Sequence, residues 1–344
     1  MTSPTSHNQS ACNVEAIDLV GALTWDPDSL IVGDHLFSSY CNLLHYHLLR
    51  CADIDSSKLI GRLISVLGQD ELRAFTNSPN VAWRLLEIDN ERTIKGICAE
   101  ALSFLEEDSF LLVDSELVPV GCSRIQGLIV DFASSYDCPS RGPKGERLER
   151  LNNSEANEAL NVVSQSLDLL KEWRQDVLRF VHIVTNVVVL RADKDRSKGF
   201  TSSSFRHHAG LTLLANPHIA LCDPLKILDS LVHEAIHALI YLYEPLNSDL
   251  CSIRPRDFRI ASPWSGRALN VDQYVQACFV WWGLLNLWRG WRGPFSDRAN
   301  QLLERAELGF KDHPVTSLLK HAGSSWLTRD ATLALLEIER LAER

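Results

Sequence analysis

The sequence lacks the features that direct a chain into a membrane or out of the cell. Its first thirteen residues are rich in Ser and Thr and have no basic stretch followed by an apolar one, so they do not resemble a signal peptide. No apolar run reaches the roughly 20 residues that a membrane helix needs, apart from one segment that carries His and Glu at its middle. We therefore expect a cytoplasmic protein with no membrane partner.

An excess of positive charge is also missing. The formal net charge is −10 at pH 7, which argues against nucleic acid as the main partner. None of the nine cysteines forms a Cys-x-x-Cys pair, so the spacing of zinc ribbons and iron–sulfur sites is excluded. An odd and scattered set of cysteines is typical of reduced, mostly buried thiols in a cytosol.

The remaining composition is that of a globular protein, with 45% hydrophobic and 23% charged residues. A chain of 344 residues can form one large domain or two ordinary ones. We expect a flexible tail over residues 1–15, an N-terminal region of helices and a small sheet over 16–140, and a metal-binding catalytic region over 146–344. The two regions are able to pack as one unit, and the Pro- and Gly-rich segment 138–146 is the expected linker.

Hydrophobic periodicity predicts an α+β fold that is mostly helical with a small sheet. Helices are predicted over residues 34–51, 57–67, 79–88, 93–105, 153–179, 223–243, 271–288, 297–309 and 328–342. Strands are predicted over residues 110–113, 117–120, 125–132, 181–190 and 208–214. Two strands followed by a helix with a metal-binding motif is the order found in zincin-like folds. In those folds an edge strand lies beside the buried motif helix and can pair with an extended peptide.

The segment 223–243 carries the most informative motif, His233-Glu234-Ala235-Ile236-His237. An Asp and a Pro at its start suit the cap and first position of a helix, and no other Gly or Pro follows until Pro245, where we expect the helix to end. On a helix His233 and His237 lie one turn apart on the same face, so both imidazoles can reach one metal ion. Glu234 lies between them and is the candidate catalytic carboxylate.

Two histidines do not complete a catalytic metal site, which needs a third protein ligand and open positions. The predicted helix over 271–288 contains neither Glu nor His, and its first residues offer Asp272, Tyr274 and Gln276 instead. Asp272 would complete the set of two histidines and one carboxylate that is typical of non-haem iron oxygenases. The three candidates stay open at this point.

Polar residues near the predicted edge strand are candidates for contact with a substrate. Ser204 belongs to a run of three serines, for which the alternative is a solvated loop. His207 and His208 are adjacent, so on a strand they would point to opposite faces and at most one could face the site. Ser204 and His208 are the two substrate-contact candidates.

These features resemble the bacterial HExxH-motif peptide-modification proteins, a group assigned as iron(II)/2-oxoglutarate-dependent peptide β-hydroxylases that act on ribosomally made precursor peptides. The resemblance covers roughly residues 180–290. It rests on the Ser-to-Gly stretch 204–210, the motif VHEAIHALI at 232–240, and the segment 262–267, which begins Ser-Pro-Trp and ends in Arg. The motif alone is only weakly specific for this family, whereas its combination with the Ser-Pro-Trp segment is moderately specific.

The resemblance implies iron(II) and 2-oxoglutarate as cofactors, with His233 and His237 as iron ligands and Glu234 as a near-site residue or further ligand. Arg267 would pair with the distal carboxylate of 2-oxoglutarate, unless it makes a structural ion pair. In the family pattern a histidine opens the following helix. This chain has Tyr274 or Gln276 there, which leaves the third ligand undecided.

Three functions follow as hypotheses. The first is an iron(II)/2-oxoglutarate-dependent enzyme that hydroxylates a side chain of a precursor peptide, with or without a leader segment. The second is a zinc metallopeptidase in which Glu234 is the general base. The third is an inactive homologue that binds a peptide without modifying it.

Overall fold

A computed structural model describes residues 14–26, 30–52, ten positions between 61 and 97, and residues 110–113, 116–119, 121–133, 148–193, 199–219, 223–322 and 324–344. The predicted tail is outside this set except for residues 14 and 15. The linker predicted over 138–146 is also outside it, and so are the helices predicted over 57–67, 79–88 and 93–105 apart from isolated positions.

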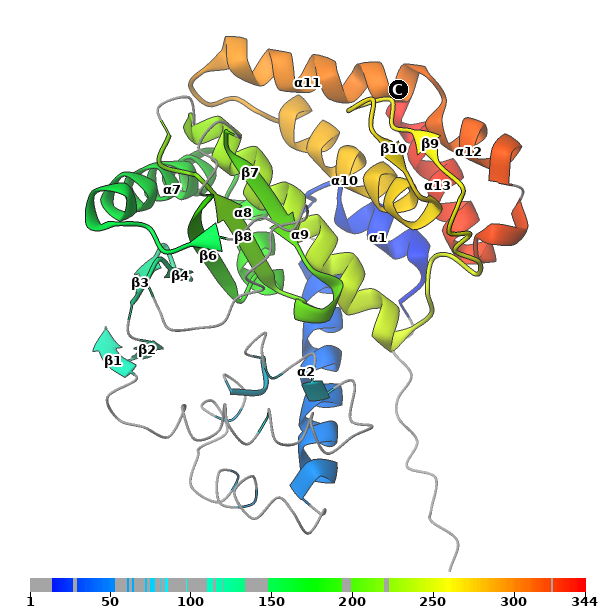
Figure 1. The fold of residues 1–344 in the computed structure, drawn as a ribbon. Coiled ribbons are helices and arrows are strands. Elements are labelled where there is room, and N and C mark those ends of the chain that lie inside the picture. The colour runs from blue at the N-terminus through cyan, green and yellow to red at the C-terminus, as the bar shows by residue number, and fades with distance from the viewer. Residues whose placement is uncertain are drawn as a thin grey trace, which may run out of the picture.

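Helices make up most of the described chain (Figure 1). They are α1 (Ala16–Ala22), α2 (Leu30–Ala52), α7 (Asn153–Trp173), α8 (Gln175–Val184), α9 (Pro224–Leu246), α10 (Val271–Arg289), α11 (Ser296–Lys311), α12 (Pro314–Ala322) and α13 (Arg329–Ala342). The strands are β1 (Phe110–Val113), β2 (Glu116–Pro119), β3 (Cys122–Ile125), β4 (Leu128–Asp131), β5 (Leu148–Glu149), β6 (Val187–Asp193), β7 (Thr201–Ser204), β8 (Leu211–Ala215), β9 (Ile260–Ala261) and β10 (Ala268–Leu269). The prediction of a mostly helical α+β fold with a small sheet is confirmed.

The main sheet has six strands, in the order β3-β4-β6-β8-β7, with β5 paired to β6. Strands β4, β6 and β8 are parallel, whereas β3 and β7 run antiparallel to their neighbours at the two ends of this order. Alternate side chains of β6 and β8 pack into different clusters: Val188 and Leu214 join the main core with the helices, while Val189 and Leu213 join a smaller cluster. The sheet is therefore covered by apolar side chains on both faces.

The helix predicted over 153–179 is two helices, because Arg174 leaves the helical region with φ −147° and ψ 62°. The Arg174 guanidinium pairs with Asp176 and donates to the carbonyl of Leu287 in α10. A Cβ at Gly290 would lie 2.5 Å from this guanidinium, so the side chain fits only beside a glycine. The break in the helix thus allows Arg174 to contact α10, which is more than 100 residues away in the sequence.

The strand predicted over 181–190 is partly wrong, because residues up to Val184 belong to α8 and the strand begins at Val187. A continuous apolar run gives no periodicity that separates a buried helix from a buried strand. Helices α1 and α12 and the short strands β5, β7, β9 and β10 were not predicted, and the strand predicted over 125–132 is divided between the end of β3 and β4.

Helix α9 lies at the centre of the molecule, in contact with α2, α7, α8 and α10 and with the strands β7 and β8 (Figure 1). The Asp223 side chain caps it by accepting from the Lys226 amide at 2.7 Å, as predicted. The predicted end before Pro245 is wrong by one turn, because the helix continues to Leu246. Within the described ranges, none of the helices is both long and apolar enough to cross a membrane.

Candidate metal centre

One face of α9 carries a polar side chain at every fourth residue, namely Asp229, His233, His237 and Tyr241. A spacing of four places them in one stripe along the helix, and all four are half-buried. The ring centroids of His233 and His237 are 5.1 Å apart, and the Tyr241 ring stacks on His237 at 6.0 Å. The structure thus brings the two motif histidines together.

The two imidazoles have the spacing of a pair that shares an ion. With metal–nitrogen bonds of about 2.0–2.1 Å and tetrahedral angles, the centroids of two coordinating rings lie roughly 5 Å apart. Burial lowers the pKa of His233 to about 4, with Glu234 opposing this shift and His237 and Arg305 adding to it. His233 is therefore neutral at neutral pH, which is the form that binds a metal.

Glu234 is buried and held by two serine hydroxyls of the neighbouring strand. Ser202 Oγ donates to Glu234 Oε1 at 2.7 Å, and Ser204 Oγ donates to Oε2 at 2.6 Å. Alternate residues of a strand point to the same side, so both hydroxyls of β7 reach α9 while Ser203 does not. The serine run is thus part of a strand and not a solvated loop, and Ser204 orients the motif carboxylate, while its contact with a substrate stays a prediction.

The strand predicted over 208–214 begins late, because Arg206–His208 form a short 3₁₀ helix and β8 starts at Leu211. The expectation that His207 and His208 point to opposite faces of a strand therefore does not apply. The His208 ring lies against Phe205, with the centroids 6.3 Å apart. Its contact with a substrate stays a prediction.

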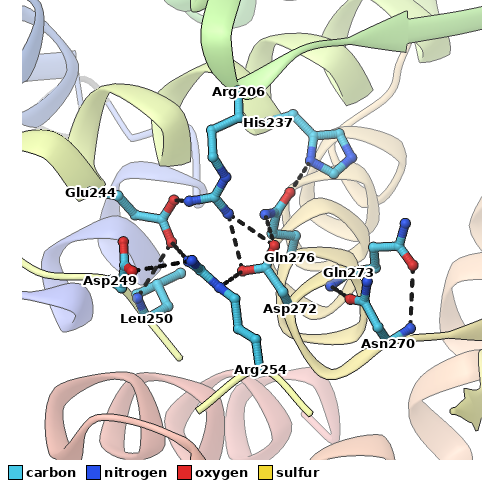
Figure 2. Close-up of polar contacts among 10 residues, drawn as sticks. All are labelled: Arg206, His237, Glu244, Asp249, Leu250, Arg254, Asn270, Asp272, Gln273 and Gln276. Carbon is cyan, nitrogen blue, oxygen red and sulfur yellow. Dashed lines mark hydrogen bonds and ion pairs between the residues drawn. The ribbon is translucent and has the colours of Figure 1, made fainter. Parts of the chain in front are cut away.

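Gln276 is the candidate third ligand that contacts a motif histidine. Its Oε1 lies 2.9 Å from His237 Nδ1, and its Nε2 donates to Asp272 Oδ2 at 3.2 Å (Figure 2). Gln276 is buried. The amide oxygen of Gln276 is thus already in hydrogen-bond contact with the ring of His237.

Asp272 lies in a cluster of ion pairs next to Gln276 (Figure 2). Arg206 donates to both of its oxygens at 2.9 and 3.0 Å, and Arg254 Nε lies 3.3 Å from Oδ1. Arg206 also pairs with Glu244, whose side chain is only 3% exposed. We call Arg206, Glu244, Arg254 and Asp272 the ion-pair cluster. Its two guanidinium groups compensate the Asp272 carboxylate in this structure.

Tyr274 points away from the histidines. It lies about 160° around α10 from both Asp272 and Gln276, and its hydroxyl donates to the carbonyl of Pro314 at 3.2 Å. In the part of the chain that the structure describes, no group of three or more His, Cys, Asp or Glu side chains is arranged to hold a metal. The donor set that fits a metal here is therefore the imidazole pair.

The Ser-Pro-Trp segment forms the loop of the β9–β10 hairpin. Trp264 is buried and stacks on Trp281 of α10, with centroids 5.7 Å apart and an interplanar angle of 7°. Its Nε1 donates to the carbonyl of Ala306 in α11. Arg267 ends this loop, and its side chain is exposed. The tryptophan of the segment thus anchors the hairpin in the core, whereas the arginine is at the surface.

Another arginine, Arg305 of α11, is also exposed but acts electrostatically on the motif. Its guanidinium stacks over Trp281 at 4.8 Å, and its Nε donates to the carbonyl of Trp264 at 3.2 Å. Its positive charge contributes to lowering the pKa of His233 and of Asp229. Burial nevertheless raises the pKa of Asp229 to about 6, with a hydrogen bond from Trp288 opposing it.

Sequence reasoning missed Arg206, Asp229, Tyr241 and Arg305. The spacing of four from Asp229 through the motif to Tyr241 was a readable signal, because it continues the stripe of the two histidines in both directions. The two arginines had no such local signal. Comparison with models of known protein families and with curated proteins returns no match.

Proposed function

We propose that this chain is a metal-dependent peptide-modifying enzyme, which binds iron(II) through His233 and His237 and uses 2-oxoglutarate to hydroxylate a side chain of a ribosomally made precursor peptide. The observation that carries the proposal is the pair of half-buried imidazoles at 5.1 Å on one face of α9. When bound, iron(II) with 2-oxoglutarate and oxygen supplies the oxidising chemistry for a C–H bond. The residues of the chain bind and orient the reactants.

His233 and His237 would supply two of the protein ligands for the iron, and the third protein ligand that such a site needs stays undecided. Asp272 stays one candidate for this third ligand, with its charge already paired with Arg206 and Arg254. Imidazole nitrogens suit iron, zinc and copper, so the donor set alone does not select the metal. The choice of iron and 2-oxoglutarate comes from the resemblance of the sequence to the peptide β-hydroxylases.

The position of Arg305 supports an anionic co-substrate. The guanidinium is fixed by its stacking on Trp281 and by the hydrogen bond from its Nε, and neither contact uses its two terminal nitrogens. Those nitrogens form a fork that matches a carboxylate. The charge of Arg305 also contributes to lowering the pKa of His233, which couples this arginine electrostatically to a proposed iron ligand.

The edge strand β7 supports a peptide as the substrate. It pairs with β8 on one side, and no strand among the described residues pairs with its other side. An extended peptide can add to such an edge through main-chain hydrogen bonds. Since Ser202 and Ser204 of this strand bond Glu234, a peptide along β7 would run beside the motif.

The experiment that tests the proposal is an anaerobic titration of the iron(II)-loaded protein with 2-oxoglutarate, followed by visible spectroscopy. We expect the charge-transfer band of a chelated keto acid in the wild type and its loss in His233→Ala. If iron binds and no band develops, the oxygenase proposal is rejected. If iron does not bind in a defined ratio, the inactive peptide-binding protein becomes the better description.

The alternative is a zinc metallopeptidase, which one observation favours. Glu234 is buried next to both histidines and oriented by Ser202 and Ser204, as a general base must be. In that case Glu234→Gln abolishes peptide hydrolysis while zinc stays bound. Hydrolysis that persists in this variant would exclude the peptidase.

A further inference from the structure

We infer that Gln276, held by Asp272 and Arg206, is a positioning residue that fixes His237 in the tautomer with its proton on Nδ1. The lone pair is then on Nε2, which becomes the nitrogen that is offered to a metal. The tautomer follows from hydrogen bonding alone, and only its use in metal binding rests on the proposed function.

The argument begins at Asp272. Nη2 of Arg206 donates to both oxygens of the Asp272 carboxylate at 2.9 and 3.0 Å, and Arg254 Nε lies 3.3 Å from Oδ1 (Figure 2). Guanidinium groups donate hydrogen bonds and cannot accept them, so they pair with the ionised form of the carboxylate. An ionised carboxylate only accepts. The group that Gln276 turns towards Asp272 must therefore be its NH₂.

The amide of Gln276 is planar, so fixing the position of its NH₂ also fixes the position of its oxygen relative to His237. With its NH₂ bonded to Asp272 at 3.2 Å, its oxygen is the atom that faces His237 Nδ1 at 2.9 Å. An amide oxygen accepts and does not donate, so Nδ1 has to carry a proton. Gln276 is only 5% exposed, which leaves little access for water to replace either contact.

A neutral imidazole with its proton on Nδ1 has a single basic nitrogen, Nε2. Metal-binding histidines usually donate their other ring N–H to a carboxylate or carbonyl oxygen, which fixes the tautomer and the ring orientation. In this chain a glutamine carries out that task and an aspartate orients the glutamine. Asp272 then acts through Gln276 on His237, and its proposed role as a metal ligand is not required.

Arg206 connects this chain of contacts to the edge strand. It lies two residues after Ser204, the last residue of β7, which holds Glu234. The segment from Ser202 to Arg206 thus orients Glu234 through hydroxyl groups, and it orients His237 through Asp272 and Gln276. A single stretch of backbone positions both functional side chains of the motif.

The test is a two-bond ¹H–¹⁵N NMR spectrum of the metal-free, ¹⁵N-histidine-labelled full chain, with the His237 signals identified by their loss in His237→Asn. We expect a protonated Nδ1 and an unprotonated Nε2 in the wild type. Gln276→Leu should lose this preference, whereas Gln276→Glu should keep it because a carboxyl oxygen still accepts from Nδ1. Gln273→Leu is the matched control on α10, since Gln273 bonds Asn270 and not His237.

A second readout is the affinity for zinc(II), measured by competition with a chromophoric chelator. Gln276→Leu should weaken it by about 10–100-fold, the usual cost of losing a partner of a metal-binding histidine. The inference is overturned if wild-type His237 carries its proton on Nε2, or if Gln276→Leu keeps the wild-type spectrum. If the tautomer is as expected and no metal binds, the proposed function fails and the tautomer assignment stands.

Discussion

Two polar regions on helix α9 differ in whether their side chains have charged or hydrogen-bonding partners. In the ion-pair cluster at the C-terminal end, Arg206 and Arg254 each contact both Glu244 and Asp272. On the motif face, by contrast, His233 has no hydrogen-bond partner among the described residues. The first region contains carboxyl groups in contact with guanidinium groups, among them Glu244, whose pKa burial raises to about 7, and the second contains a neutral base with an open lone pair.

This difference separates a structural role from a binding role. Burying a charge is costly unless it is paired, so the cluster satisfies its members and has no capacity left for a ligand. A neutral imidazole is less costly to bury, and its lone pair can still bind an ion. Changes in the cluster should therefore act mainly on stability and reach metal affinity only through Gln276, whereas changes in the histidines act on metal affinity directly.

The largest effect is expected for Arg206→Met. The substitution leaves Glu244 and Asp272 with Arg254 as their remaining guanidinium, and breaking a buried ion pair by removing one partner costs about 3–5 kcal/mol. Urea unfolding should show this loss. Arg254→Met is the control, because its side chain is 41% exposed and a surface pair contributes about 1 kcal/mol or less. Equal losses in the two variants would contradict the assignment of Arg206 to the centre of the cluster.

A metal affinity at least about 100-fold weaker is expected for His233→Ala and for His237→Ala, since each removes a direct ligand and not merely an outer partner. Zinc(II) competition titration measures it. His321→Ala removes an exposed histidine at the end of α12 and should leave the affinity unchanged. If both motif variants bind zinc like the wild type, the motif is not the metal centre. The motif face would then have no binding role that distinguishes it from the ion-pair cluster.

The sequence was sufficient to predict the parts of the site that depend on neighbours along the chain. Asp223 caps α9 as its residue type suggests, and a spacing of four brings His233 and His237 onto one face. The start of α10 was also predictable at residue 271, where Asn270 and Gln273 form a reciprocal capping box. These features follow from hydrogen bonds and periodicity within one or two turns.

The remaining contacts join segments that are distant in sequence. Arg206 meets Asp272 across 66 residues, and Arg305 meets Trp264 across 41. Nothing local to either arginine indicates its partner, because a charged residue on a turn or on an exposed helix face is ordinary. The sequence-based choice of Arg267 came from the resemblance alone, whereas the structure adds Arg305 as a candidate near His233.

Arg305 and Arg267 can be compared by how much the replacement of each weakens 2-oxoglutarate binding. This is the next largest expected effect. Arg305→Met should weaken binding to the iron(II) protein by about 10-fold, because it removes a charge-assisted hydrogen bond of at least roughly 1.5 kcal/mol. Arg267→Met should have little effect. Both are measured by anaerobic titration of the keto-acid band. If Arg267→Met weakens 2-oxoglutarate binding more than Arg305→Met does, Arg267 is the arginine that binds the carboxylate, as the resemblance predicts.

The smallest effect concerns Asp229, at the N-terminal end of the motif face. Burial raises its pKa to about 6, above the roughly 3.9 of an unfolded Asp. Between about pH 4 and pH 6 the folded state thus holds more protons than the unfolded state, so this group makes stability fall as the pH rises. Asp229→Asn removes the ionisation and can still accept from Trp288 Nε1.

The unfolding free energy of Asp229→Asn relative to the wild type should therefore increase across this window, by about 1–2 kcal/mol between pH 4 and pH 7. Urea unfolding at several pH values measures the difference, and Asp297→Asn, at an exposed position, is the control. The positive charges of Arg305 and Arg298 both act to lower the pKa of Asp229, and a constant difference across the window would mean that they compensate its carboxylate fully. Asp229 would then resemble the ion-pair cluster and not His233.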